Sequence, residues 1–124
     1  MEVGPRLTAM FALNFYSDLY GDILRNNRKT VSIRLGDKSS KYQTGMIVWV
    51  TVGPRFGRRQ KLYSAILDRV EVKTIADLSP RDIERESPEF RSQDDVIAIL
   101  SRIYGDFVTP EHHVTVIYFS RVDE

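Results

Sequence analysis

Arg28-Lys29-Thr30-Val31-Ser32-Ile33-Arg34 is the stretch from which the fold and the chemistry of this chain are best approached. Its alternation is typical of a short strand, with Ser32 and Arg34 on one face. Val31 and Ile33 then point to the other face and can close a hydrophobic core. The polar face presents a hydroxyl beside a guanidinium, so this strand is expected to form one wall of a binding site.

Length and composition indicate an ordinary globular protein. The chain has 124 residues, of which 42% are hydrophobic and 28% charged, and we expect one domain spanning residues 1–124. It contains no cysteine, which excludes disulfides, thiolate nucleophiles and cysteine-ligated metal sites. No apolar run approaches the roughly 18 residues of a membrane span, and residues 1–6 lack the pattern of a signal peptide. We therefore expect a cytoplasmic protein with no membrane partner.

The charge is unevenly distributed although the net charge is only +1. Residues 1–61 hold 11 Lys and Arg against 4 Asp and Glu, whereas residues 62–124 hold 7 against 13. Residues 25–61 alone carry 10 basic residues against a single acid, Asp37. Such a local excess favours an anionic ligand, with a merely solvated basic surface as the alternative.

The candidate ligand-binding residues come from this basic region. One of them is aromatic and is a candidate for stacking on an unpaired base, although the same loop also reads as a hairpin tip without function. The full set is Arg28, Arg34, Lys38, Lys41, Arg55, Phe56, Arg58 and Arg59.

Hydrophobic periodicity and turn residues predict an α+β fold with the order β-α-β-β-β-α-α-β. Strands are expected over residues 8–15, 28–34, 46–52, 62–72 and 113–122, the third with Trp49 in the core. Helices are expected to begin at Ser17, Ser79 and Ser92, and Gly105 is expected to end the last one. The alternation shifts near residues 68–69, which predicts a bulge. Short mixed strands with helices at two points suit a small mixed β-barrel or curled sheet with helices covering its ends.

Several short motifs, taken in order, resemble one known family. They are Leu13-Asn14-Phe15, residues 27–34, Thr44-Gly45, residues 72–78 and residues 114–119. Their order and spacing over roughly residues 10–122 are similar to those of the ASCH domain family, which belongs to the PUA-like superfold. The resemblance implies a pseudo-barrel with a cleft between barrel and helices, and RNA or a modified nucleoside or nucleotide as partner.

One small bacterial branch of that family consists of amidohydrolases that act on N4-acetylcytidine with a Lys, a Thr and a Glu. The resemblance places these catalytic positions on Lys29, Ser32 and Glu86. The chain departs from the branch at Ser32, where the family has Thr, and at Asn27 and Met46, where the family has glycine and an acidic residue.

Catalysis by a serine hydroxyl requires a base, because almost none of it is ionised at neutral pH. Lys29 would serve if burial and the neighbouring Arg28 and Arg34 lowered its pKa. The alternative is that Lys29 and Arg34 only bind anions, that Ser32 is a plain strand hydroxyl and that Glu86 is solvated.

The sequence supports a metal site less than it supports an anion-binding site. His112 and His113 are adjacent and point to opposite faces of a strand, so they do not make a metal site, and no cofactor is predicted. We therefore expect an RNA- or modified-nucleoside-binding module, with an amidohydrolase as the alternative. A metal-dependent ribonuclease is a weaker third hypothesis, which sensitivity of RNA cleavage to EDTA would distinguish.

Overall fold

The structure, a computed structural model, describes residues 11–15, 24–25, 30–54, 57–87, 90–105 and 107–122. The strands are β1 (Phe11–Phe15), β2 (Val31–Leu35), β3 (Ile47–Val52), β4 (Gln60–Thr74) and β5 (His113–Val122). A 3-10 turn, η1 (Ile75–Asp77), follows β4, and the helices α2 (Pro80–Glu86) and α3 (Gln93–Tyr104) lie between η1 and β5.

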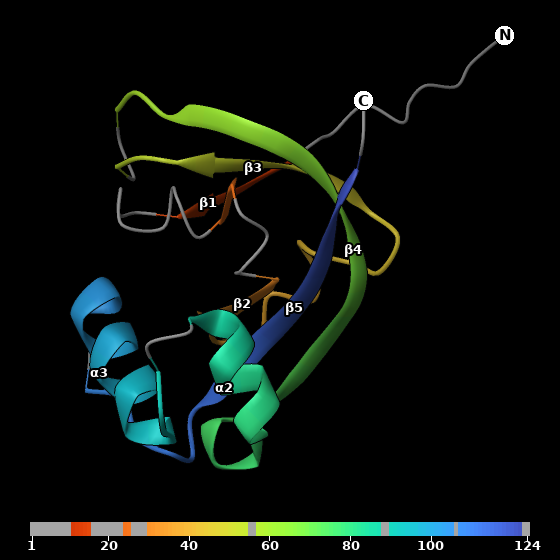
Figure 1. Ribbon diagram of the computed structural model, residues 1–124. Coiled ribbons are helices and arrows are strands. Elements are labelled where there is room, and N and C mark those ends of the chain that lie inside the picture. The colour runs from red at the N-terminus through yellow and green to blue at the C-terminus, as the bar shows by residue number, and fades with distance from the viewer. Residues whose placement is uncertain are drawn as a thin grey trace, which may run out of the picture.

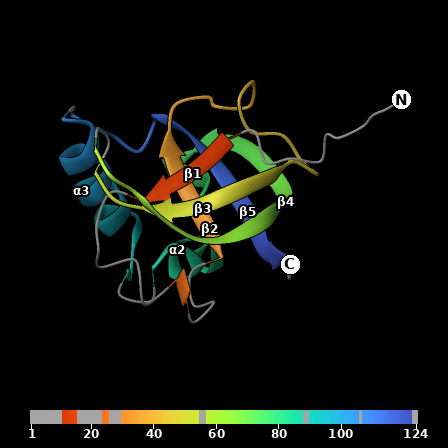
Figure 2. The ribbon, with the colours of Figure 1, turned by 90° about the horizontal axis from the view of Figure 1, so that it is seen from above.

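The five strands form one curled sheet in the order β1-β3-β4-β5-β2, shaped as a half-barrel (Figures 1 and 2). The edge strand β1 runs parallel to β3, and the other neighbouring pairs are antiparallel. The helices α2 and α3 lie together at the end of the half-barrel that contains β2 (Figure 1). The two edge strands, β1 and β2, are those that build the candidate site.

Two hydrophobic clusters hold the fold together, and β5 contributes to both. Its residues 114–119 are all buried, since one face of the strand meets the half-barrel and the other meets the helices. Ile117 and Phe119 belong to the half-barrel cluster, with Leu13 and Leu67. The second cluster contains the apolar face predicted for β2, because Val31 and Ile33 pack with Ile83, Val96 and Val116. That prediction is confirmed.

The predicted helix ends on the second half of the chain are also confirmed. Ser79 caps α2: its Oγ accepts from the backbone N of Asp82 at 3.1 Å, and the Asp82 carboxylate accepts from the backbone N of Ser79 at 3.2 Å. Gly105 ends α3 with φ +71°, a left-handed conformation that glycine adopts without steric cost. The bulge is confirmed as well, since the β4–β5 register shifts between Leu67 and Arg69.

The structure differs from the predicted elements in one addition and one length. The turn η1 was not expected. The strand β4 extends beyond the predicted residues 62–72 at both ends, and it pairs with both β3 and β5. Of the helix expected from Ser17, Leu24 and Arg25 are helical and the rest lies outside the described residues. The prediction that Trp49 is a core residue is wrong: its side chain is 43% exposed because it points away from the half-barrel cluster. No described helix is long and apolar enough to cross a membrane.

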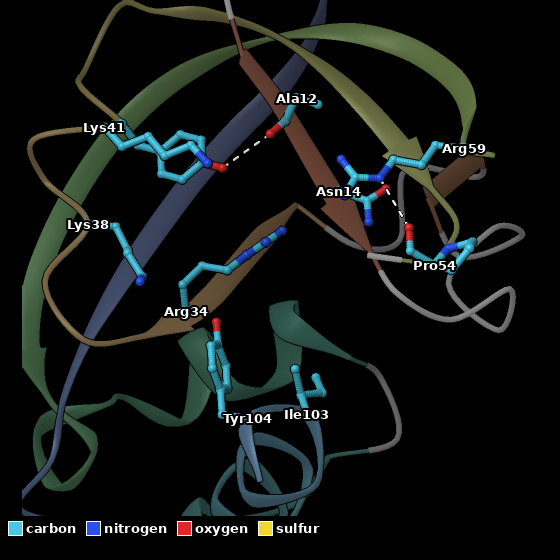
Figure 3. A pocket seen from close by; sticks show the side chains of 10 residues that line it. Ala12, Asn14, Arg34, Lys38, Lys41, Pro54, Arg59, Ile103 and Tyr104 are labelled. Carbon is cyan, nitrogen blue, oxygen red and sulfur yellow. Dashed lines mark hydrogen bonds between the residues drawn. The ribbon is translucent and has the colours of Figure 1, made fainter. Parts of the chain in front are cut away.

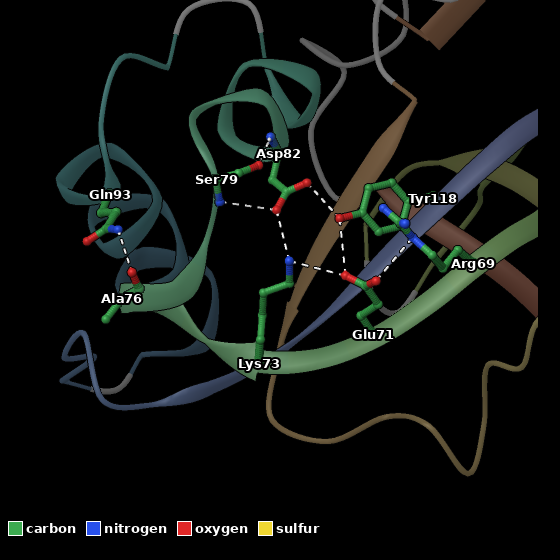
Figure 4. A network of polar contacts seen from close by, with 8 residues as sticks. All are labelled: Arg69, Glu71, Lys73, Ala76, Ser79, Asp82, Gln93 and Tyr118. Atoms are coloured by element: carbon green, nitrogen blue, oxygen red, sulfur yellow. Dashed lines mark hydrogen bonds and ion pairs between the residues drawn. The ribbon is translucent and has the colours of Figure 1, made fainter.

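A polar network that is buried at Asp82 and Tyr118 joins α2 to the sheet (Figure 4). The Tyr118 hydroxyl donates to Asp82 at 2.6 Å, and the Lys73 ammonium contacts Asp82 at 3.1 Å and Glu71 at 3.2 Å. The Arg69 guanidinium lies 4.1 Å from the centre of the Tyr118 ring. Burial raises the pKa of Asp82, but hydrogen bonds from Tyr118, Lys73 and the Ser79 backbone together outweigh it and hold that pKa below the usual 3.8.

Candidate functional site

A cleft of about 710 Å³ opens between the two sheet edges and the end of α3 (Figure 3). Its volume falls in the range of about 300–1,000 Å³ that is common for small-molecule sites. Four cationic side chains line it, and no acidic residue of the described chain does. We call it the basic cleft; its cations are Arg34, Lys38, Lys41 and Arg59. Its uncharged walls are Ala12, Asn14, Tyr42, Pro54, Ile103 and Tyr104.

The loop after β2 carries two of these cations and is anchored at both ends. The Thr115 hydroxyl on β5 accepts from the backbone N of Lys38 at 2.7 Å and donates to the Gly36 carbonyl at 2.7 Å. Further along, the Tyr42 hydroxyl donates to the Ala12 carbonyl on β1 at 3.1 Å. The Lys41 ammonium lies 5.2 Å from the centre of the Tyr42 ring. These contacts hold the loop against β5 at one end and against the edge strand β1 at the other.

Asn14 presents its amide to the cleft in a fixed orientation. Its Oδ1 accepts from the Thr51 hydroxyl at 2.7 Å, and its Nδ2 donates to the Gly53 carbonyl at 3.0 Å. The side chain is buried, and it lines both the basic cleft and a smaller cavity behind it. Because both ends of the amide are engaged, Asn14 acts as a rigid part of the wall.

The smaller cavity, the inner chamber, holds about 30 Å³ and is lined by Ser32, Glu86, Leu100 and Phe15. It shares Asn14, Arg34, Ile103 and Tyr104 with the basic cleft, so the two adjoin. The Glu86 Oε2 accepts from the backbone N of Ile33 at 2.7 Å, which ties α2 to β2. The Ser32 hydroxyl accepts from Nε of Arg34 at 2.6 Å. Glu86 and Ser32 are both buried, at 6% and 2% exposure.

The structure places the predicted site residues in three groups. Ser32 and Glu86, which are 54 positions apart in the sequence, share the inner chamber. Among the predicted ligand-binding residues, four meet in the basic cleft, whereas the side chain of Arg58 is exposed and does not line it. Arg28, Lys29, Arg55 and Phe56 lie outside the described residues.

Sequence reasoning missed the uncharged walls. Asn14 carried one signal, a lone amide within an apolar strand. Ile103 follows Val96 and Leu100 at helical spacing, which is typical of a core residue, but its side chain is 39% exposed and lines the cleft. It lies in the last turn of α3, where the helix reaches past the core to the cleft.

No group of three or more His, Asp or Glu side chains within the described ranges is arranged to hold a metal ion. His112 is engaged locally, since its Nδ1 accepts from the backbone N of Thr109 at 2.9 Å. The donor set of the cleft is cationic and therefore suits an anion rather than a metal.

Solved structures show what this arrangement resembles. An ASCH domain from Lactobacillus crispatus JV V101 superposes with a TM-score of 0.66 and 18% sequence identity, over 92% of this chain and 80% of that one. The chain has the fold of an ASCH domain. A DUF984 protein from Enterococcus faecalis V583 matches with a TM-score of 0.71 and 14% identity, over 94% of this chain and 82% of that one.

A third structure with a similar fold is the hypothetical protein PH0355, at a TM-score of 0.65 and 14% identity, over 90% of this chain and 98% of that one. No protein-family model and no curated protein matches the sequence. The half-barrel with its two helices is consistent with the PUA-like superfold to which the sequence resemblance pointed. An ASCH fold by itself leaves function open, so the activity has to be argued from the cleft.

Proposed function

We propose that this ASCH-fold chain binds RNA or a modified nucleoside in the basic cleft. The observation that carries the proposal is the clustering of Arg34, Lys38, Lys41 and Arg59 around one cavity, without an acidic residue of the described chain among its walls. Cations gathered in this way attract phosphate groups and make the affinity depend on salt.

The walls of the cleft also suit a nucleoside. Tyr42 and Tyr104 offer aromatic surface, and the fixed Asn14 amide and the Tyr104 hydroxyl offer polar groups. Unpaired bases are commonly held by aromatic side chains and by hydrogen bonds to their edges. A volume of about 710 Å³ is sufficient for a nucleotide.

Two neighbouring arginines provide the test. Arg59 lines the cleft and its Nε donates to the Pro54 carbonyl at 3.2 Å, whereas Arg58 is exposed away from it. For a single-stranded RNA of about 10 nucleotides, Arg59→Ala is expected to weaken binding about five-fold at about 0.1 M salt and to reduce the salt slope by about 0.7. Arg58→Ala is expected to change neither quantity. Fluorescence anisotropy between about 50 and 200 mM salt measures both.

Equal losses in the two variants would place RNA on the open surface and not in the cleft. Failure of the wild-type protein to bind either RNA or nucleosides at low salt would contradict the proposal itself.

The second candidate is hydrolysis of an N-acylated cytidine, favoured by the meeting of Ser32 and Glu86 in one chamber. The hydrogen bond from Arg34 to the Ser32 oxygen would stabilise an alkoxide there. We expect Ser32→Ala to abolish release of acetate from N4-acetylcytidine while the melting temperature stays close to that of the wild type. Ser64→Ala, a change at a buried serine on β4 outside both cavities, is the control. Wild-type protein that releases no acetate would rule out this substrate.

A further inference from the structure

The described neighbours of Arg34 do not satisfy all of its hydrogen-bond donors. Its side chain is half-buried, with Nε donating to Ser32 at 2.6 Å and Cζ lying 5.0 Å from the centre of the Phe15 ring. Its Nη2 is buried and has no hydrogen-bond partner among the residues that the structure describes. Figure 3 shows the side chain extending from β2 toward Asn14, across the floor of the basic cleft. A buried donor without a partner costs free energy comparable to a lost hydrogen bond.

The positive charge of Arg34 likewise has no ion-pair partner within the described part of the chain. No carboxylate of the described residues lies within the 4.0 Å of an ion pair with it. Glu86 lines the same inner chamber, but its Oε2 is engaged by the backbone of Ile33 and it forms no ion pair with Arg34. Burial of an uncompensated charge is unfavourable, so an anionic group bound to Arg34 would satisfy both the charge and the free Nη2.

The size of the inner chamber indicates which part of a ligand reaches Arg34. The chamber adjoins the basic cleft at Arg34, holds about 30 Å³ and is lined by buried residues such as Ser32, Leu100 and Glu86. A phosphodiester within a strand has a nucleotide on each side, and the chamber is too small to hold one of them. A phosphate at the end of a strand has a nucleotide on one side only. The other cations, Lys38, Lys41 and Arg59, lie along the open part of the cleft, where further phosphates can follow.

We propose that Arg34 binds a terminal phosphate monoester, carried either by the end of an RNA strand or by a free nucleotide. Such a group has a charge of about −1.5 to −2 and three acceptor oxygens, which suits a guanidinium that still offers donors. The inference rests on the proposed function and adds to it that the cleft recognises the end of the ligand by its phosphate.

The experiment compares one RNA sequence of about 10 nucleotides in three forms: with a 5′-phosphate, with a 3′-phosphate, and with hydroxyls at both ends. Wild-type protein is expected to bind one phosphorylated form roughly 10- to 100-fold more tightly than the hydroxyl form. A nucleoside and its monophosphates form a second arm. A preference of similar size in this arm assigns the site to free nucleotides as well as to RNA ends.

Variants test whether Arg34 is the residue that produces the preference for phosphorylated RNA. Arg34→Gln is expected to bring the ratio between phosphorylated and hydroxyl RNA close to one, and Arg34→Lys to retain only part of it because the two-pronged contact is lost. Ser64→Ala, at a buried serine that lines neither cavity, is expected to keep the preference, and Arg58→Ala is the surface control. Circular dichroism checks that each variant is folded.

The possible failures are distinguishable. Wild-type protein that binds all three RNA forms equally would overturn this inference while leaving the proposed function intact. A phosphate preference that survives in Arg34→Gln would also overturn it, and absence of any RNA or nucleotide binding would remove the proposed function itself. If Arg34→Gln does not fold, the wild-type comparison and the Arg34→Lys variant still decide.

Discussion

Asp82→Ala is expected to lower the free energy of unfolding by about 3–5 kcal/mol, one of the two largest losses we expect from a single change. The variant removes the short hydrogen bond of the Tyr118 hydroxyl and the buried counter-charge of the Lys73 ammonium, and among the described carboxylates leaves both groups only with Glu71, at 3.5 Å and 3.2 Å. It also removes the side chain that accepts from the N-cap of α2. Urea denaturation of the variant and the wild type measures the difference. Asp68→Ala, at an exposed acid on β4, is expected to cost less than about 0.5 kcal/mol.

The same residue makes stability depend on pH in a defined direction. The folded pKa of Asp82 lies below the usual 3.8, so its contribution is complete above that pH and is lost as the pH falls through the folded pKa. The stability gap between the wild type and Asp82→Asn should therefore be constant near neutrality and should narrow below about pH 4. A gap that stays unchanged down to about pH 2 would show that the network is not ionic. An Asp82→Ala loss of under about 1 kcal/mol would show that the network contributes little.

Glu86→Ala is expected to cost about 2–3 kcal/mol, because it leaves the buried backbone N of Ile33 without its acceptor. The same bond joins α2 to β2, so the wall of the inner chamber should loosen as well. Glu86→Gln keeps a carbonyl oxygen at this position and is expected to retain most of the stability. Thermal or urea unfolding distinguishes the two variants.

This pair also separates a structural role of Glu86 from a catalytic one. If the wild type releases acetate from N4-acetylcytidine, a Glu86→Gln protein that is stable but releases none would favour a catalytic role of Glu86. Equal stability of Glu86→Ala and the wild type would contradict the anchoring role.

The parts of the fold that the sequence predicted are those set by local interactions. The cap of α2 at Ser79, the left-handed stop at Gly105 and the bounds of β5 each depend on residues within a few positions of one another. The strand order and the exposure of Trp49 depend on which strands pair, and β1 pairs with β3 although β2 lies between them in the chain. Local patterns carry no information on such pairings.

In the candidate site, too, the sequence predicted the local features but not those that depend on long-range packing. An excess of cations over residues 25–61 predicted an anion-binding region, and four of the predicted residues do meet in one cleft. Arg58 and Arg59 are indistinguishable in sequence, and only the path of the chain at the start of β4 separates them. Likewise, the meeting of Ser32 with Glu86 follows from α2 packing on β2, and in the sequence only the family resemblance linked the two residues.

The position of β2 at one edge of the sheet has a consequence for how the protein is made. Among the described strands its one neighbour is β5, which follows α2 and α3, so Val31 pairs with Tyr118 across most of the chain. Contacts this distant form slowly, and during translation they cannot form before β5 has left the ribosome. Until then the nascent chain exposes unpaired edges of β2 and β4, which invite pairing with other chains. The wall that carries Arg34 is therefore among the last parts of the molecule to be assembled.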